Sequence, residues 1–336
     1  MKKRHYHNPV LSILSVLKKY TDENHTLSQK QINELIFSEY EDEFDRETIR
    51  NNLLELIDFN LPVRYQENDP EKERFVMRNL YYEHEFTDGE LRLLINSVLF
   101  ADGLSKKHRN DLIKKLEGLT SKYFHSVIDK IDMNAYDNVE NTEIFLTIEN
   151  INEAIVKGVQ ISFVKTDNNK RYIVSPYQLV SSSGHLYLLC NYFAHDDTIT
   201  HFRIDRLKDS KVLSEPLKPL RTFEGYESGI QLCNYVKEHP HMWGGKVVTV
   251  TFKCKKYLRN NLFEQFGTEI KIEETDDDML LVRLKASENA MYHWGLQYLD
   301  GVEMLSPERL REKLKDAVKD AYRKYCCDSE KGGDNS

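Results

Sequence analysis

The sequence has no long hydrophobic run, few cysteines and no excess of basic residues. No stretch approaches the roughly 18 consecutive apolar residues that a membrane-spanning helix needs. The five cysteines are odd in number and contain no CxxC pair, which argues against a zinc ribbon or a disulfide scaffold and fits a reducing cytoplasm. The formal net charge of -8 excludes a polybasic nucleic-acid coat, so any contact with nucleic acid must be local.

Motifs of common enzyme classes are also missing. The sequence contains no GxGxxG, GxxxxGK[ST], HExxH or GxSxG. The HxH pair in residues 239–243 lies beside a proline and is more typical of a loop than of a metal site. The acidic cluster at residues 273–278 lacks the glycine and terminal glutamate of a calcium loop. We therefore expect no catalytic residue, no metal, no cofactor and no enzyme activity.

The length and composition allow several domains. A chain of 336 residues with 40% hydrophobic residues can form two or three domains, each with its own core. The N-terminus carries basic residues followed by apolar ones, as a signal peptide does, but serines interrupt the apolar run, lysines follow it and no small-residue cleavage site is present. This segment predicts an amphipathic helix instead.

The first 82 residues predict three helices and a hairpin. Asn8, Ser28 and Asp45 are each placed to cap a helix whose apolar residues repeat at helical spacing. Two β-like runs, LPVRYQ and RFVMRNLYY, follow and are joined by a polar turn. This order is that of a winged helix-turn-helix, a DNA-binding domain.

The third predicted helix has a polar face suited to DNA. Arg46, Arg50 and Asn51 lie opposite its apolar stripe, and Arg and Asn are the side chains that pair bidentately with guanine and adenine edges in the major groove. Arg64 and Arg74 lie on the hairpin, where a wing would reach phosphates. The alternative is a solvated surface, and residues 1–80 hold 12 Lys or Arg against 15 Asp or Glu. DNA binding therefore requires a polarised surface and two copies in a dimer.

Beyond residue 82 the composition changes twice. Residues 83–139 predict a helical connector. Residues 140–215 contain short β-like runs separated by turns, as in a small barrel or meander. Residues 246–326 alternate strands and helices and end in a long amphipathic helix, which predicts an α/β sandwich-like extension and dimerisation domain. The fold class expected is α+β and multidomain.

The stretch HFRIDRL, residues 201–207, carries charged residues on a strand-like pattern. By alternation, His201, Arg203 and Asp205 share one face, and the preceding strand presents His185 and Tyr187 on the same face if the two strands pair. A guanidinium fork beside an aromatic ring suits a phosphate with a base stacked next to it. The alternative is that Asp205 bridges an arginine and the cluster only pins the barrel.

The run SPYQLVSSSGHLYLLCNYFAHDDTITHFRIDRL resembles the core of a WYL domain. The family's Trp-Tyr-Leu triplet reads Leu186-Tyr187-Leu188 here, with leucine in place of tryptophan, and residues 202–207 match its arginine-containing strand. The proline before the first strand of the run matches Pro176. The segment with Trp294 and GVEMLSPERLREKL resembles the C-terminal extension that often accompanies WYL domains. Together with the winged helix, the resemblance covers nearly the whole chain.

The resemblance implies a function. WYL domains are Sm-like or SH3-like barrels thought to sense nucleic-acid or nucleotide effectors, in bacterial cytoplasmic transcription regulators that are commonly homodimers. Tyr187, Arg203 and Arg206 match the motif, whereas His185 and His201 follow from alternation alone. We expect operator DNA and a nucleic-acid or nucleotide effector as partners, no membrane, and most simply a repressor. The alternative is an accessory module whose barrel binds single-stranded nucleic acid or a protein.

Overall fold

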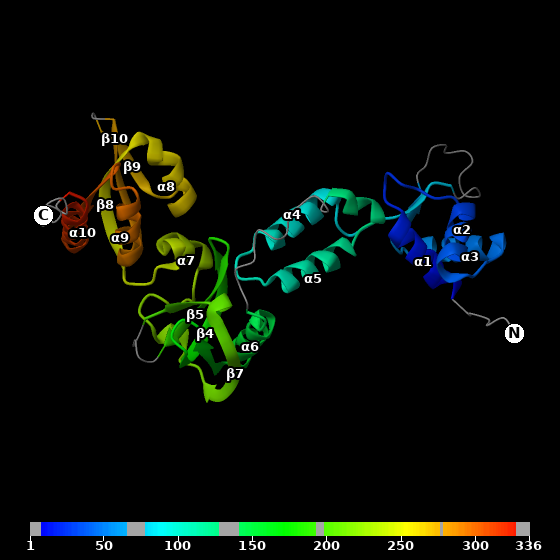
Figure 1. Cartoon of the computed structure of the whole chain (residues 1–336), viewed down its shortest axis with the longest axis horizontal. Helices are drawn as coiled ribbons and strands as arrows, with labels where there is room; N and C mark the ends of the chain where they lie inside the picture. Colours follow the sequence, from blue (N-terminus) through cyan, green and yellow to red (C-terminus); the bar gives the residue numbers. More distant parts are fainter. Residues whose placement is uncertain (1–7, 66–77, 128–140, 193–197, 276–277, 327–336) are drawn as a thin grey trace, which may run out of the picture. The chain divides into compact units, whose positions relative to one another are not determined.

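The computed structural model describes residues 8–65, 78–127, 141–192, 198–275 and 278–326 (Figure 1). The chain divides into two compact units, residues 1–140 and 141–336. Both contain helices and antiparallel strands, so the predicted α+β class is confirmed. Within the described segments, every helix is too short or too polar to cross a bilayer.

The first unit begins with three capped helices. Asn8 accepts from the Val10 amide, Ser28 forms a capping box with Gln31, and Asp45 accepts from the Thr48 amide. All three predicted helix starts are therefore confirmed. A two-stranded antiparallel hairpin follows, giving the order α1 (Pro9–Tyr20), α2 (Gln29–Tyr40), α3 (Arg46–Asp58), β1 (Val63–Tyr65) and β2 (Leu80–Tyr82). The helices bury a common apolar core that includes Ile13, Leu17, Ile32, Ile36, Ile49 and Leu53.

A helical pair follows within the same unit. The helices α4 (Asp88–Leu99) and α5 (Lys106–Glu117) lie side by side (Figure 1, cyan) and precede a short 3-10 helix, η1 (Lys122–Val127). His84 bridges this pair to α1, because its ring nitrogens lie 3.1 Å from the Leu119 carbonyl oxygen and 2.9 Å from the Thr21 carbonyl oxygen. The segment after α5 therefore contacts the end of α1, whereas α4 and α5 form an apolar cluster of their own.

The second unit opens with α6 (Ile144–Lys157) and a five-stranded antiparallel sheet of order β6-β5-β4-β3-β7. Its strands are β3 (Val159–Lys165), β4 (Lys170–Ser182), β5 (His185–Tyr192), β6 (Thr200–Arg203) and β7 (Leu207–Pro216). Ser183 and Gly184 join β4 to β5, and both have positive φ. A two-residue turn of this kind matches the twist of its strands and favours glycine at its second position.

This sheet corrects the expected barrel. Among the described residues it is open, because β6 and β7 are its two edges and no ladder of hydrogen bonds joins them. Only the 3-10 turn η3 (Ile204–Arg206) separates these strands in the chain, so the two edges meet at one corner. HFRIDRL is therefore not one strand: β6 ends at Arg203 and the chain turns before β7. The buried rings of Phe163 and Phe202 pack against each other inside the curled sheet, with the edge of one ring against the face of the other.

Residues 217–246 link the five-stranded sheet to the rest of the unit. They contain η4 (Leu220–Thr222), α7 (Leu232–Glu238) and η5 (Pro240–Met242). Tyr235 of α7 and Met242 pack with Leu189 of β5 in a small buried cluster. One face of β5 and β6 is therefore partly covered by the linker rather than exposed.

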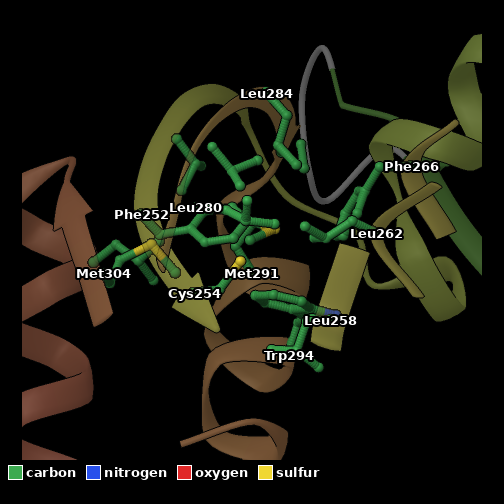
Figure 2. Packing of buried hydrophobic residues seen from close by; sticks show 14 of the residues in the cluster. Phe252, Cys254, Leu258, Leu262, Phe266, Leu280, Leu284, Met291, Trp294 and Met304 are labelled. Carbon is green, nitrogen blue, oxygen red and sulfur yellow. The ribbon is translucent and has the colours of Figure 1, made fainter. Parts of the chain in front are cut away.

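The last part of the unit is a four-stranded antiparallel sheet of order β11-β8-β10-β9 with helices between its strands. The chain order β-α-β-β-α-β and this strand order define a ferredoxin-like arrangement. Figure 2 shows Phe252, Leu280 and Trp294 in the core between the sheet and its helices. The elements are β8 (Val247–Lys255), η6 (Lys256–Leu258), α8 (Arg259–Phe266), β9 (Lys271–Glu274), β10 (Met279–Ser287), α9 (Glu288–Gln297), β11 (Val302–Ser306) and α10 (Glu308–Cys326).

Candidate functional site

The polar face of α3 is exposed where the sequence predicts it. Ile49, Leu53 and Leu56 are buried, whereas Arg46 and Asn51 are exposed on the other side of the helix. Arg50 is only half-exposed. Arg46 also borders a cavity of about 760 Å³ between α2 and α3, together with Lys30 and Arg78. Lys30 is a cation of this region that the helical pattern of α3 could not reveal, because it belongs to α2.

The hairpin arginines differ in their surroundings. Arg64 donates to the carbonyl oxygens of Leu61 and Val63 at 2.7 and 3.1 Å, and its guanidinium forms an ion pair with Glu83 at 2.8 Å. These contacts hold it against the base of the hairpin. Arg74 lies outside the described residues. A phosphate contact by Arg64 would require it to exchange its carboxylate partner for the phosphate.

The second candidate site lies on β5 and β6. Tyr187 is the register partner of Arg203 in the β5–β6 ladder, so their side chains share one face. Burial raises the pKa of the Tyr187 hydroxyl, and the nearby charges of Arg203 and Arg206 work in the opposite direction. The strand register and these charge interactions show that the Tyr187 ring and the two guanidinium groups are neighbours.

Arg203 is tied to Asp205 by two hydrogen bonds. Its Nε lies 3.1 Å from Oδ1 and its Nη2 lies 2.7 Å from Oδ2, a bidentate pair. The Asp205 side chain is only 8% exposed, and that of Arg203 is 23% exposed. A carboxylate this buried requires a partner. The structural role expected as the alternative is therefore present: Arg203 neutralises Asp205.

Arg206 is the more accessible cation of the site. Its side chain is 46% exposed, and its ion pair with Asp167 is long at 3.4 Å. Lys165 approaches the same carboxylate at 3.2 Å. Although burial works in the opposite direction, these two cations lower the pKa of Asp167. Arg206 follows Asp205 on the η3 turn, so the three motif residues meet at the corner where β6 becomes β7.

The corner is held by a residue that sequence reasoning did not find. The Asn141 carboxamide donates to the carbonyl oxygens of Asp205 and Leu207, both at 2.9 Å. Because Asn141 precedes this turn by more than sixty residues in the chain, no local pattern could have connected it with the turn.

Comparison with known families now decides the identity of these elements. Residues 147–212 match the WYL domain, and residues 246–322 match the WCX domain. The chain contains a WYL domain followed by a WCX domain. The WYL match runs from α6 into β7, and the WCX match runs from the residue before β8 to α10.

Solved structures show more distant likenesses. The chain is similar to proteasome accessory factor B/C (PafBC) of Arthrobacter aurescens, at 15% identity over 97% of this chain and 51% of that one, with a TM-score of 0.29. It thus spans about half the length of that protein. A CRISPR Cas-related protein has 15% identity over 96% of this chain and 86% of its own, with a TM-score of 0.38. No curated protein matches the chain.

The two histidines predicted for the WYL face have different surroundings. His185 lies edge-on to Tyr187, with ring centroids 6.3 Å apart, and is half-buried. The placement of His201 is corrected, because α7 and η5 cover it. Its Nε2 lies 2.6 Å from the Tyr235 hydroxyl and its Nδ1 lies 2.7 Å from the Met242 carbonyl oxygen. Burial lowers the pKa of His201 to about 4.

His201 therefore joins the WYL sheet to the linker. His239 stacks on Tyr235 with ring centroids 4.1 Å apart and contacts His201 edge-on. His201 precedes Arg203 by two residues on β6, so α7 contacts the strand that carries Arg203.

Proposed function

We propose that this WYL-domain protein is a DNA-binding transcription regulator, most simply a repressor, whose WYL domain senses a nucleic-acid or nucleotide effector. Residues 1–82 would bind operator DNA through α3, and the protein would act without a cofactor or enzyme activity. A homodimer would place two α3 helices on two half-sites. The domain order supports this proposal, since helices and a hairpin precede the WYL and WCX domains.

The convergence of Tyr187, Arg203 and Arg206 at the β6–β7 corner carries the proposal. Arg206 is half-exposed and weakly paired, so it can receive a phosphate, while the Tyr187 ring can stack with a base. Arg203 is positioned by Asp205. A phosphate that competes with Asp205 for Arg203 would favour a second arrangement of the corner, and such a population shift would change operator binding.

The DNA-binding half is tested by fluorescence anisotropy of the full chain on duplex DNA from upstream of its own gene and on a scrambled duplex. We expect a preference for the native duplex, and the loss of about 1–3 kcal/mol of that preference for each of Arg46→Ala and Asn51→Ala. Lys18→Ala is the matched control, because Lys18 is an exposed cation on α1. Equal weak binding to both duplexes would contradict a regulator.

The effector half is tested by adding short oligonucleotides to the protein–operator complex. Arg206→Gln should remove the response to the oligonucleotide and leave operator affinity unchanged, since Arg206 lies in the other compact unit from α3. Analytical ultracentrifugation of the same samples tests the homodimer. An unaltered response in Arg206→Gln would exclude this corner as the effector site.

One observation favours a second function. Residues 1–80 carry more acidic than basic side chains, and Arg64 is already paired with Glu83. A first domain with a net negative charge suits an accessory protein that binds single-stranded nucleic acid or a protein partner through the WYL domain. A preference for single strands over every duplex, without a steep salt dependence on duplex DNA, would support this alternative.

A further inference from the structure

The WCX sheet buries one face and exposes the other. Along β8 and β10, Val250, Phe252, Leu280 and Val282 face the core, whereas the alternating positions Thr249, Arg283 and Lys285 are exposed. The helices α8, α9 and α10 contribute to the buried side. Among the described residues, the helix that approaches the opposite face is α7, beside β10.

Cations gather on this exposed face. Arg283 of β10 is the register partner of Lys271 on β9, and Lys285 follows two residues later on the same side. Like charges placed directly opposite each other destabilise a sheet. Among the described residues, no carboxylate forms an ion pair with Lys271, Arg283 or Lys285, although Lys285 is near enough to Glu238 for its charge to oppose the rise in the Glu238 pKa that burial causes. In a chain with a formal net charge of -8, this is an unusual surface and indicates an anionic partner.

A groove runs beside these cations. A cavity of about 530 Å³ lies between α7 and the sheet and is lined by Lys271, Arg283 and Lys285 together with Lys237 of α7. Gly267 leaves space for the Lys237 side chain: a Cβ at that position would lie 2.8 Å from the lysine Cε. Two carboxylates, Glu238 and Glu269, also line the groove, so its four cations exceed its anions by two.

Neutral groups complete the lining. Thr249 and Asn234 offer hydrogen-bond donors of the kind that contact sugar and phosphate oxygens, and Ile270 supplies an apolar contact for a sugar. Cations on adjacent strands lie about 5 Å apart, and those two residues apart on one strand lie about 7 Å apart. The row is thus longer than one phosphate and fits successive phosphates of one chain.

We propose that this groove of the WCX domain binds the sugar-phosphate backbone of a single-stranded nucleic acid. A groove of this volume accommodates a ligand of nucleotide size rather than a duplex. The exposed sheet positions that line it carry no aromatic side chain, so recognition is of the backbone and not of sequence. This site is separate from the Tyr187 corner and does not depend on the regulator proposed above.

The helix α7 connects the groove with the WYL domain. Lys237 and Glu238 line the groove, whereas the Tyr235 hydroxyl of the same helix donates to Nε2 of His201 on β6, because the Nδ1 proton of that ring faces the Met242 carbonyl oxygen. A single-stranded nucleic acid in the groove would therefore contact α7, the helix that covers part of one face of β5 and β6.

The test measures binding of the full chain to a fluorescein-labelled oligothymidylate of about 12 nucleotides, at salt concentrations from about 50 to 200 mM. We expect Lys271→Gln/Arg283→Gln to weaken binding about tenfold at low salt and to reduce the slope of log affinity against log salt by about 1.4, or about 0.7 for each phosphate that the variant no longer neutralises. Lys319→Gln on α10 is the matched control, because it removes an exposed cation outside the groove.

Two further variants separate the explanations. Glu269→Gln removes an anion from the groove and should tighten binding, a gain that a misfolded protein could not produce. Arg206→Gln acts on the WYL corner alone. If only Arg206→Gln weakens oligothymidylate binding, or if the double variant binds as the parent does, the groove proposal is wrong. Equal affinity for a polyglutamate peptide, with the same loss in the double variant, would also overturn it and identify an acidic protein segment as the occupant.

Discussion

Replacement of Arg203 should lower the free energy of unfolding of the second unit, whether or not a ligand is present. Arg203→Ala leaves the Asp205 carboxylate, which is 8% exposed, without its bidentate partner. Breaking a fully buried pair costs about 3–5 kcal/mol, and because the arginine is 23% exposed we expect a loss of about 2–3 kcal/mol here. The second substitution Asp205→Asn removes the uncompensated charge and should restore about half of that loss.

Both tryptophans of the chain, Trp243 and Trp294, belong to the second unit, so their fluorescence reports its unfolding. Urea titrations of the parent, the single variants and the double variant complete the cycle. A shift of less than about 0.5 kcal/mol in Arg203→Ala would refute the reasoning, because it would mean that Asp205 does not depend on Arg203. Effector measurements on Arg203 variants should therefore use Arg203→Ala/Asp205→Asn, or Arg206→Gln instead.

Three further outcomes follow from local features. Burial lowers the pKa of His201 to about 4, below its usual 6.5. The stability that the neutral ring contributes is therefore fully present above about pH 6.5 and is lost as the pH falls toward 4. The urea midpoint should fall as the pH is lowered through this range, and His201→Gln should make the midpoint depend less on pH. Gly267→Ala should cost about 1–3 kcal/mol, since Gly267 has φ +83° and ψ 173°, a region that only glycine adopts readily; an unchanged thermal midpoint would contradict this. Ser28→Ala removes the capping box of α2 and should cost about 1 kcal/mol, measured by circular dichroism, while Ser28→Thr should retain most of the stability.

Local features of the fold were predictable because their signals lie within a few residues. The caps at Asn8, Ser28 and Asp45 fix helix starts through a side chain and an amide two or three positions away. Alternation predicted that Tyr187 and Arg203 share one face of two paired strands, and the register of β5 and β6 pairs these two residues.

Other features depend on partners far along the chain. The strand β7 was not predicted, because LKDSKVLSEP is a polar edge strand whose place in the sheet is defined by pairing with β3. The 3-10 turn at Ile204–Arg206 interrupts a pattern that reads as one continuous strand. His201 has the alternation of an exposed residue, and only the packing of Tyr235 and Met242 over it shows that it is covered.

Propensity, capping and periodicity act between near neighbours, so the capped helices and most strands could be predicted from the sequence. The resemblance to WYL domains pointed to Tyr187, Arg203 and Arg206. Contacts in the tertiary structure pair Arg203 with Asp205, place α7 over His201 and set Lys271 opposite Arg283 beside a groove. These are outcomes of strand register and of the docking of distant segments. Such contacts depend on how the whole unit packs, so no periodic pattern within a single stretch of the chain predicts them.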